Sequence, residues 1–329
     1  MPERIYDPVN YQLNGTEFRD PEEFRKFLDK ITDVPESQPL NPIEIDEAGI
    51  TSQQVYIEID DITDPTKKSP ILCDVTLSVD LKGHRGIHMS RCEEALFELA
   101  EGNYPDLDTF AVALAERLRE KQSSNLGIVK ISATHLHHRN TRKTGKQTHD
   151  KVILLSEAVA EESIVRQRTG VQAYNITACP CTRTYTKLSV VPRLQELGFD
   201  TTQINAILNT VLTGTHTQRG TITVMMDKRH PEISTRELLT VLDTTTHLVN
   251  ELLKRPDEHD LVVRALSRPQ FTEDVVRDVA AGLYEKFGTK APDDTRLRIE
   301  SILNDSIHIH DVRTVIDTNL GNIGESLKD

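Results

Sequence analysis

The alternation of apolar and polar residues predicts strands in the first half of the chain. The runs QQVYIEID and CDVTLSVDL place an apolar residue at every second position, as a strand with one buried face does. Helical periodicity follows, and in its second stretch one face carries the apolar residues Leu107, Phe110, Ala111, Leu114 and Leu118. The elements expected in order are strands at 53–60 and 73–81, helices at 91–100 and 106–120, and strands at 127–135 and 151–157.

The second half of the chain repeats this order of elements. Ser234 followed by Glu237 has the pattern of a capping box and opens a long helix. The expected elements are strands at 171–177 and 221–226, helices at 234–253 and 273–287, and strands at 297–302 and 312–317. The repeat therefore predicts two ββααββ modules, at 46–165 and 166–329. Antiparallel strands with helices on one face make a two-layer α+β sandwich.

Two further segments lie outside the repeat. Residues 1–45 are polar and punctuated by prolines, so we expect an N-terminal arm with one short helix at 21–30. Asp20 suits the N-cap of that helix, and Pro21 suits its first position. Residues 182–215 form an insertion between the first two strands of the second module. Within this insertion, helices are expected at 191–197 and 202–212.

Composition and charge exclude several classes of function. The 329 residues include 39 Lys and Arg against 52 Asp and Glu, a formal net charge of -13, which argues against a general nucleic-acid binder. No apolar run is long enough for a transmembrane helix, and the first residues lack the apolar core of a secretory signal. Four cysteines are too few for a disulfide framework, so we expect a reducing, cytoplasmic location.

Three residue types that bind metals occur at distinctive positions. Cys179 opens the run Cys-Pro-Cys at a strand end, and a thiolate there is a soft ligand for zinc or iron. His216 lies in a polar loop flanked by glycines, and Glu258 lies where a helix is expected to end at Pro256. A buried structural cysteine and a solvated turn are the alternatives. Together, the three side chains would leave one metal position open for water.

Two histidines near the C-terminus form a second candidate. His308 and His310 alternate along a strand-like stretch, which places them on one face. Two imidazoles on one face suit proton transfer near neutral pH, or metal ligation. The alternative is an exposed edge strand.

Two basic segments are candidates for binding anions. Arg85, His88 and Arg91 lie between a strand and a helix, where arginines and a helix N-terminus can bind phosphate. Residues 135–146 hold four Lys or Arg, three His and no acid. The alternatives are an ordinary basic loop for the first segment and a flexible hairpin tip for the second.

Six motifs in series resemble the type IB GTP cyclohydrolases. They are HRGIHMSR, TACPC, THTQRG, LLKRPDE, QFTEDVVRDVA and SIHIHD, and the resemblance covers roughly residues 50–315. The family includes a bacterial folate-pathway enzyme and an archaeal methanopterin-pathway enzyme. The resemblance implies two tandem tunnelling-fold modules in each chain. It also implies a homo-oligomer, dimeric or tetrameric, with active sites at the subunit interfaces.

The resemblance also implies roles for individual residues. Cys179, His216 and Glu258 match the metal ligands of the family. Iron(II) is the first choice of metal, with zinc or manganese as alternatives for the same donor atoms. The remaining matches are Glu273 as the anchor of the guanine ring, His308 and His310 as proton donors or acceptors, and Arg85, His88 and Arg91 as substrate-binding residues.

The implied reaction opens the imidazole ring of GTP at C8 and releases formate. TACPC and the insertion at 182–215 look more like the archaeal branch, whose product is a dihydroneopterin cyclic phosphate. The folate branch, with dihydroneopterin triphosphate as product, is the alternative. Residues 135–146 depart from the Lys-Lys-x-Pro-Val-Ser-Gly run of the family.

Two other functions remain as rivals. One is a non-catalytic protein that binds a metal or a nucleotide, and the other is a nitrile reductase with Cys179 or Cys181 as nucleophile. The pairing of His216 with Glu258 argues against both, because neither function needs all three ligands.

Overall fold

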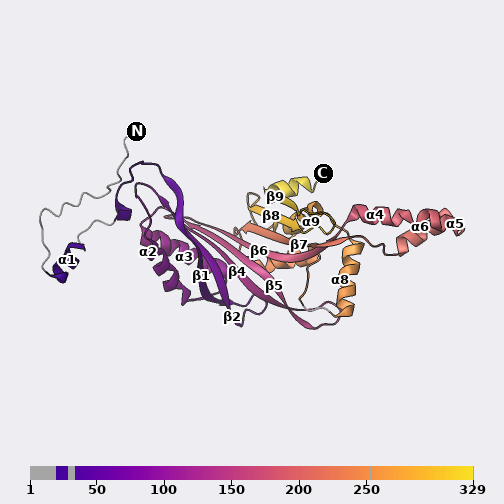
Figure 1. Ribbon diagram of the computed structural model, residues 1–329, viewed down its shortest axis with the longest axis horizontal. Coiled ribbons are helices and arrows are strands. Elements are labelled where there is room, and N and C mark those ends of the chain that lie inside the picture. Colours follow the sequence, from indigo (N-terminus) through magenta and orange to yellow (C-terminus); the bar gives the residue numbers. More distant parts are fainter. Residues whose placement is uncertain (1–19, 29–33, 252–253, 329) are drawn as a thin grey trace.

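The computed structural model describes residues 20–28, 34–251 and 254–328 (Figure 1). The elements of the first half are α1 (Pro21–Leu28), the 3-10 helix η1 (Val34–Glu36), β1 (Ile45–Asp60), β2 (Lys68–Leu81), α2 (Met89–Ala100), β3 (Asn103–Tyr104), α3 (Leu107–Gln122), β4 (Gly127–Asn140) and β5 (Gln147–Ala160). Those of the second half are β6 (Val165–Ala178), α4 (Pro180–Ser189), α5 (Val191–Glu196), α6 (Thr201–Thr210), β7 (Thr217–Asp227), α7 (Thr235–Thr245), α8 (Arg255–Ser267), α9 (Thr272–Phe287), β8 (Arg296–Leu303), β9 (Val312–Asn319) and α10 (Leu320–Ser326).

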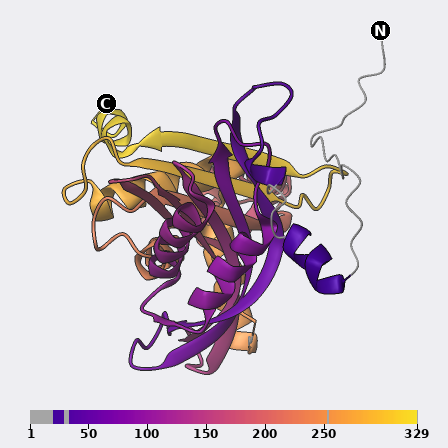
Figure 2. The same cartoon turned by 90° about the vertical axis from the view of Figure 1, so that its left-hand side faces the viewer.

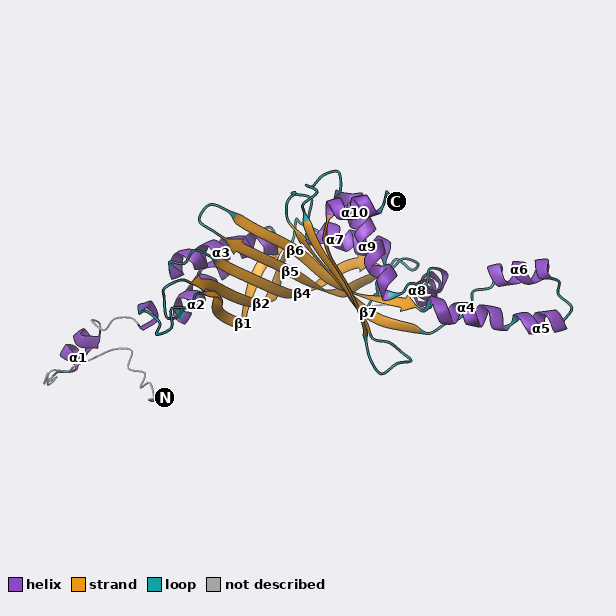
Figure 3. Cartoon of the chain, turned by 90° about the horizontal axis from the view of Figure 1, so that it is seen from above, coloured by secondary structure: helices purple, strands orange, loops and turns teal. Residues whose placement is uncertain are grey.

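All strands of the described residues belong to one sheet, in the order β3-β1-β2-β4-β5-β6-β7-β8-β9. Neighbouring strands are antiparallel, apart from the two-residue parallel pairing of β3 with β1. The two ββααββ series join where β5 pairs with β6, so they share one continuous sheet (Figure 3). The predicted α+β class and its tunnelling-fold arrangement are confirmed.

Helices cover one face of the sheet, as Figures 1 and 2 show. In the first series α3 packs on β4 and β5, and in the second α7 and α9 pack on β6 and β8. The apolar face predicted for α3 is fully buried, including Phe110 and Leu114. Each such side chain contributes about 1.5–3 kcal/mol by leaving water. The alternate strand residues, such as Val75 and Leu77 of β2, belong to the same hydrophobic core.

The antiparallel register defines two ends of the sheet. Gly127 pairs with Val79 and with Ala160 at one end. At this end β2 is followed by the loop that holds Arg85. Ala178 pairs with Thr217, and Leu303 with Val312, at the opposite end. We call these the Arg85 end and the Cys179 end. They are separated by the length of β6, whose 14 residues span roughly 40 Å.

The predicted helix at 234–253 is wrong in its second half. α7 ends at Thr245, after which the main chain runs beside β6: Ile176 N–H donates to the His247 carbonyl at 2.9 Å, and Val249 N–H donates to the Tyr174 carbonyl at 3.0 Å. Three consecutive threonines, 244 to 246, end the helix, because β-branched residues are weak helix formers. Residues 252 and 253 lie outside the described part of the chain.

A new helix, α8, begins where a helix was expected to end. Pro256 lies in its first turn, where a missing N–H costs nothing and the fixed backbone angle favours the helix.

In the insertion, α5 and α6 confirm the two predicted helices, but α4 was not foreseen. The short helix α1 is also confirmed, with Glu22 N–H donating to Asp20 Oδ1 at 2.9 Å. Its predicted residues 29 and 30 lie outside the described residues.

Among the described helices, none has the length and apolar character that crossing a membrane would require.

Candidate active site

Cys179 and His216 are brought together by the pairing of β6 with β7. Each residue continues its strand by one position beyond the pair Ala178 and Thr217, and Cys179 N–H donates to the His216 carbonyl at 3.1 Å. Thr215 Oγ1 donates to the Cys179 carbonyl at 3.0 Å. Both side chains are partly exposed. The sheet therefore places two predicted ligands side by side, although they are 37 positions apart in the sequence.

The loop between β8 and β9 fixes the ring of His216. His216 Nδ1 lies 3.2 Å from Ser306 Oγ, so the other ring nitrogen remains available to bind a metal. Ser306 was not a predicted site residue. Ser306 is, however, the first residue of the SIHIHD motif, which is the signal that could have identified it.

His308 and His310 lie in this same loop, and the prediction that they alternate along a strand is wrong. β8 ends at Leu303 and β9 begins at Val312. Asp305 turns the chain by accepting from the N–H groups of Ile307 at 2.8 Å and His308 at 3.0 Å, which is an alternative to strand pairing. These two bonds hold the pKa of Asp305 below its usual range.

The two imidazoles nevertheless face the same region. Their ring centroids lie 5.3 Å apart, and both residues are exposed. His308 Nδ1 lies 3.1 Å from Asp305 Oδ1, so the carboxylate favours a proton on Nδ1 and leaves Nε2 free for exchange. Sequence reasoning missed Asp305.

Glu258 and Glu273 lie in the first turns of α8 and α9 and are exposed. Both turns are at the Cys179 end. The first turn of α8 contacts the tip of the β4–β5 hairpin. α9 follows Gln270, whose Nε2 donates to the Thr245 carbonyl at 3.3 Å, close to the segment paired with β6. The described residues contain no group of three His, Cys, Asp or Glu side chains positioned to hold a metal ion. Thus Cys179 and His216 are adjacent, but Glu258 does not join them in a preformed three-ligand site.

Arg85, His88 and Arg91 lie at the opposite end of the sheet from Cys179. Glu36 Oε1 pairs with Arg91 Nη2 at 3.3 Å and lies 3.5 Å from His88 Nε2. The N–H of Arg85 donates to the carbonyl of Pro35 at 3.0 Å, in the same 3-10 helix. One copy of the chain therefore keeps these three residues away from the cysteine and histidines.

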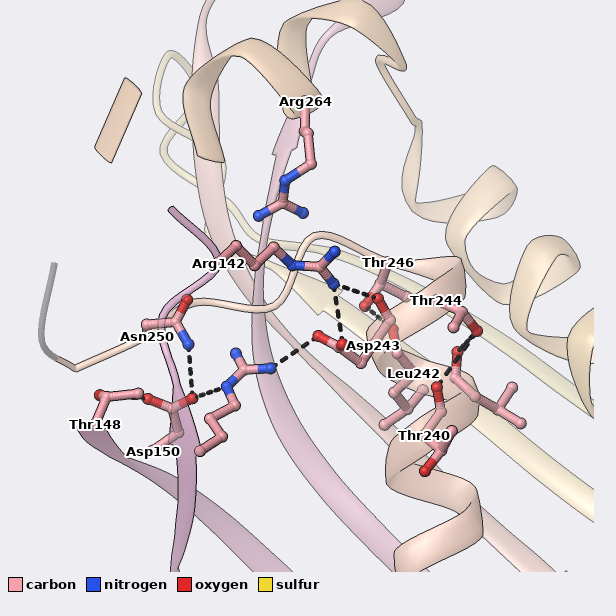
Figure 4. A network of polar contacts seen from close by, with 12 residues as sticks. Arg142, Thr148, Asp150, Thr240, Leu242, Asp243, Thr244, Thr246, Asn250 and Arg264 are labelled. Atoms are coloured by element: carbon pink, nitrogen blue, oxygen red, sulfur yellow. Dashed lines mark hydrogen bonds and ion pairs between the residues drawn. The ribbon is translucent and has the colours of Figure 1, made fainter. Parts of the chain in front are cut away.

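The basic segment 135–146 forms the end of the β4–β5 hairpin, and carboxylates of the same chain pair with its arginines (Figure 4). Arg139 pairs with Asp150 and, at 2.8 Å, with Asp243. Arg142 also pairs with Asp243, at 2.9 Å. Burial alone would raise the pKa of Asp243, but the two guanidinium groups lower it. The arginines of this segment are therefore paired with carboxylates of the same chain.

The alternative, a flexible hairpin tip, is right about the hairpin, but hydrogen bonds to Asp243 and Asp257 hold the tip. A cavity of about 460 Å³ lies beside the pairs and is lined by Arg139, Asp150 and Asp243 among other residues. The carboxylate partners were missed, because Asp243 lies 104 residues from Arg139 and no local pattern links them.

Comparison with known proteins identifies the family. The model of the type I GTP cyclohydrolase folE2 family matches residues 31–314. GTP cyclohydrolase MptA of Methanosphaera stadtmanae is 30% identical over 327 residues, covering 92% of this chain and 99% of that protein. GTP cyclohydrolase MptA 2 of Methanocella arvoryzae is 28% identical over 305 residues, covering 89% and 97%.

Solved structures of lower sequence similarity were also found. Uricase from Arthrobacter globiformis is 7% identical with a TM-score of 0.49, covering 84% of this chain and 96% of that one. A hyperthermostable urate oxidase mutant from Bacillus sp. TB-90 is 9% identical with a TM-score of 0.49, covering 84% and 98%. The family model, by contrast, spans most of the chain and includes all six motifs. The chain belongs to the type I GTP cyclohydrolase folE2 family.

Proposed function

We propose that this enzyme is a metal-dependent GTP cyclohydrolase that opens the guanine imidazole ring at C8 and releases formate. Membership of the family supports the class of reaction. The observation that carries the proposal is the meeting of Cys179, His216 and the loop with His308 and His310 at one end of the sheet. Its substrate and its free thiols fit a cytoplasmic location.

The donor atoms present at the Cys179 end fit a divalent metal. Cys179 and His216 are neighbours, and Ser306 holds the imidazole with one nitrogen free. Glu258 has no side-chain partner among the described residues, so its carboxylate is available as the third ligand. Iron(II) is our first choice, with zinc or manganese as alternatives. When bound, such a metal supplies a Lewis acid that lowers the pKa of water.

The other residues bind the substrate and move protons. The Glu273 carboxylate accepts hydrogen bonds from the ring N–H and the exocyclic amine of guanine. His308 or His310 donates a proton to the ring nitrogen that departs from C8. Asp305 holds the ring of His308 in one orientation for this transfer.

A complete site requires a second copy of the chain. Arg85, His88 and Arg91 are our candidates for contacts with GTP, and they lie at the far end of the sheet from Cys179. The outer edges of β1 and β9 are also unpaired in the described residues, apart from the short contact of β1 with β3. Strand edges of this length need a partner. We therefore expect a homo-oligomer, a dimer or tetramer, in which the Arg85 end of one copy meets the Cys179 end of another.

A mixing experiment tests this arrangement. Cys179→Ala and a double variant, Arg85→Ala with Arg91→Ala, should each be inactive alone. If the site is shared, exchange of subunits between them restores part of the activity, because some interfaces combine two intact ends. Continued inactivity of mixtures that demonstrably exchange subunits would contradict a shared site, and light scattering that shows a monomer would contradict the oligomer.

For the product, we propose a 7,8-dihydroneopterin cyclic phosphate rather than the triphosphate. The insertion with α4, α5 and α6 supports the archaeal type of enzyme, and the relatives described above carry the name MptA. The test is anaerobic incubation of the iron-loaded protein with GTP, followed by formate measurement and mass spectrometry. Formate with a triphosphate product would assign the folate type. Metal binding without formate would favour a non-catalytic role.

A further inference from the structure

We propose that Asp257 is a positioning residue: it anchors the first turn of α8, which carries Glu258, to the tip of the β4–β5 hairpin. This inference rests on the proposed function, because it takes Glu258 as a metal ligand. Asp257 is 4% exposed, whereas its neighbour Glu258 is exposed. Adjacent residues of a helix point about 100° apart, so anchoring Asp257 sets the direction in which the Glu258 side chain leaves the helix.

The contacts of Asp257 use both of its carboxylate oxygens. Oδ1 accepts from the N–H groups of Lys143 at 2.9 Å and Thr144 at 3.1 Å. Oδ2 accepts from Thr144 Oγ1 at 2.6 Å and from Lys254 N–H at 3.3 Å. The residue thus caps the start of α8 and binds the hairpin at the same time. With four donors on its oxygens, Asp257 is not free to act as a ligand itself.

Hydrogen bonds within the hairpin hold its tip. Thr141 N–H donates to the Lys146 carbonyl at 2.8 Å, and the hydroxyls of Thr141 and Thr144 lie 2.9 Å apart. Gly145 has a φ of 63°, which glycine adopts at no steric cost. Arg139 and Arg142 of the hairpin pair with Asp243 of α7, and Figure 4 shows Arg142 beside Asp243. The first series of elements therefore fixes the start of a helix that belongs to the second.

The other buried residues of α8 lie further along the helix. Within this helix, all of which is described, the buried residues are Asp257, Leu261 and Ala265. Leu261 and Ala265 hold the middle and the end of the helix. Asp257 is the buried residue of the first turn, which carries Glu258. We call the hydrogen bonds between Asp257 and the hairpin tip the clamp. Loss of the clamp therefore leaves the helix packed but frees its first turn.

The test measures affinity for Co²⁺ in the full-length protein, by competition with a chelator and by the thiolate-to-cobalt absorption band. Asp257→Asn keeps the size of the side chain but presents an NH₂ to groups that are themselves donors. We expect affinity about 10–100-fold weaker, as for other groups that orient metal ligands. The unfolding midpoint should also fall, because the amide leaves buried donors without an acceptor. Thr144→Val removes one of the four donors and should cause a smaller loss.

Asp260→Asn is the matched control. Asp260 lies one turn further along α8 and pairs with Arg264 at 2.9 Å and the Lys143 ammonium at 3.3 Å, but binds no backbone N–H of the tip. It should bind Co²⁺ like the parent. If Asp257→Asn did not fold, Thr144→Val would still report on the clamp.

A double-mutant cycle separates positioning from general stability. In a Glu258→Gln background, Asp257→Asn should cause no further loss of Co²⁺ affinity, because the residue acts through Glu258. An added loss in that background would overturn the proposal, as would Asp257→Asn and Thr144→Val proteins with parental affinity. If Glu258→Gln itself bound Co²⁺ like the parent, the assignment of Glu258 as a ligand would be wrong instead.

Discussion

Two helical segments border the candidate site, and the protein holds them in different ways. α8 is fixed at its first turn by the buried carboxylate of Asp257. The arm formed by α4, α5 and α6 extends away from the sheet, as Figures 1 and 3 show. Ile204 is the only buried residue in the three helices of the arm, all of which are described.

The difference shows what determines the position of each proposed ligand. Cys179 and His216 flank the arm, but the pairing of β6 with β7 continues to them and places them without its help. Glu258 has no strand to hold it and depends on the contact with the hairpin. The comparison therefore predicts a site sensitive to the strand ends and the hairpin, and insensitive to the arm.

The largest effect is expected from loss of a ligand at the strand end. Cys179→Ala should abolish activity and metal binding, because it removes the thiolate, and Glu258→Ala should do the same. Cys181→Ala is the control, since Cys181 is exposed in the first turn of α4. Metal content and formate release measure the outcome, and circular dichroism checks the fold. Equal metal loss in both cysteine variants would mean that the arm carries a ligand and that the comparison is wrong.

Local patterns in the sequence predict the secondary-structure elements and the chemical groups of the site, but not the contacts between distant residues. Alternation locates the middle of the strands, but β4 extends to Asn140 through a polar stretch, because hydrogen bonds continue there without a buried face. The motifs identify the chemical groups of the candidate site. They do not reveal that Asp305 turns the chain at His308. Nor do they reveal that Asp257 binds Thr144, because 113 residues separate the two.

A smaller effect is expected at Glu273, on the helix next to α8. Glu273→Gln should impair GTP turnover by about 2–4 kcal/mol of binding or transition-state energy, because the amide has one acceptor oxygen and turns an NH₂ toward guanine donors. Metal should remain stoichiometric, since the three proposed ligands are untouched. Steady-state kinetics measures GTP turnover, and metal analysis measures the metal content. Parental turnover would exclude the guanine-anchor role, and a metal-free protein would place Glu273 among the ligands.

The β4–β5 hairpin should also make the stability of the protein depend on pH. Burial lowers the pKa of His137 to about 4, and the charges of Arg139 and His135 add to the effect. Below about pH 6.5 the unfolded chain binds a proton that the folded chain does not, so stability falls as the pH drops from 6.5 toward 4. The loss attributable to His137 should be about 2–3 kcal/mol, allowing for the solvent that reaches the ring.

His137→Asn provides the measurement. Urea unfolding at pH 7 and pH 4.5, at one protein concentration, should show a smaller pH difference for the variant than for the parent. His135 and His247 also have pKa values lowered by burial, so part of the pH dependence should remain. An identical pH difference in the two proteins would show that His137 is protonated as readily in the folded state as in the unfolded chain.

The smallest effect is expected from the arm. Replacement of residues 183–211 by a short Gly-Ser linker removes one buried side chain, that of Ile204, and leaves Cys179 and His216 joined by the same backbone hydrogen bond. The unfolding midpoint should therefore shift by only a few degrees, which is the change that about 1 kcal/mol produces in a domain of ordinary size. Co²⁺ affinity should be parental, in contrast to Asp257→Asn, because the strand ends place these two proposed ligands and the hairpin anchors the helix that carries the third. A shortened protein that kept its fold but lost metal would reverse the conclusion: the arm, and not the ladder of β6 and β7, would then hold Cys179 in position.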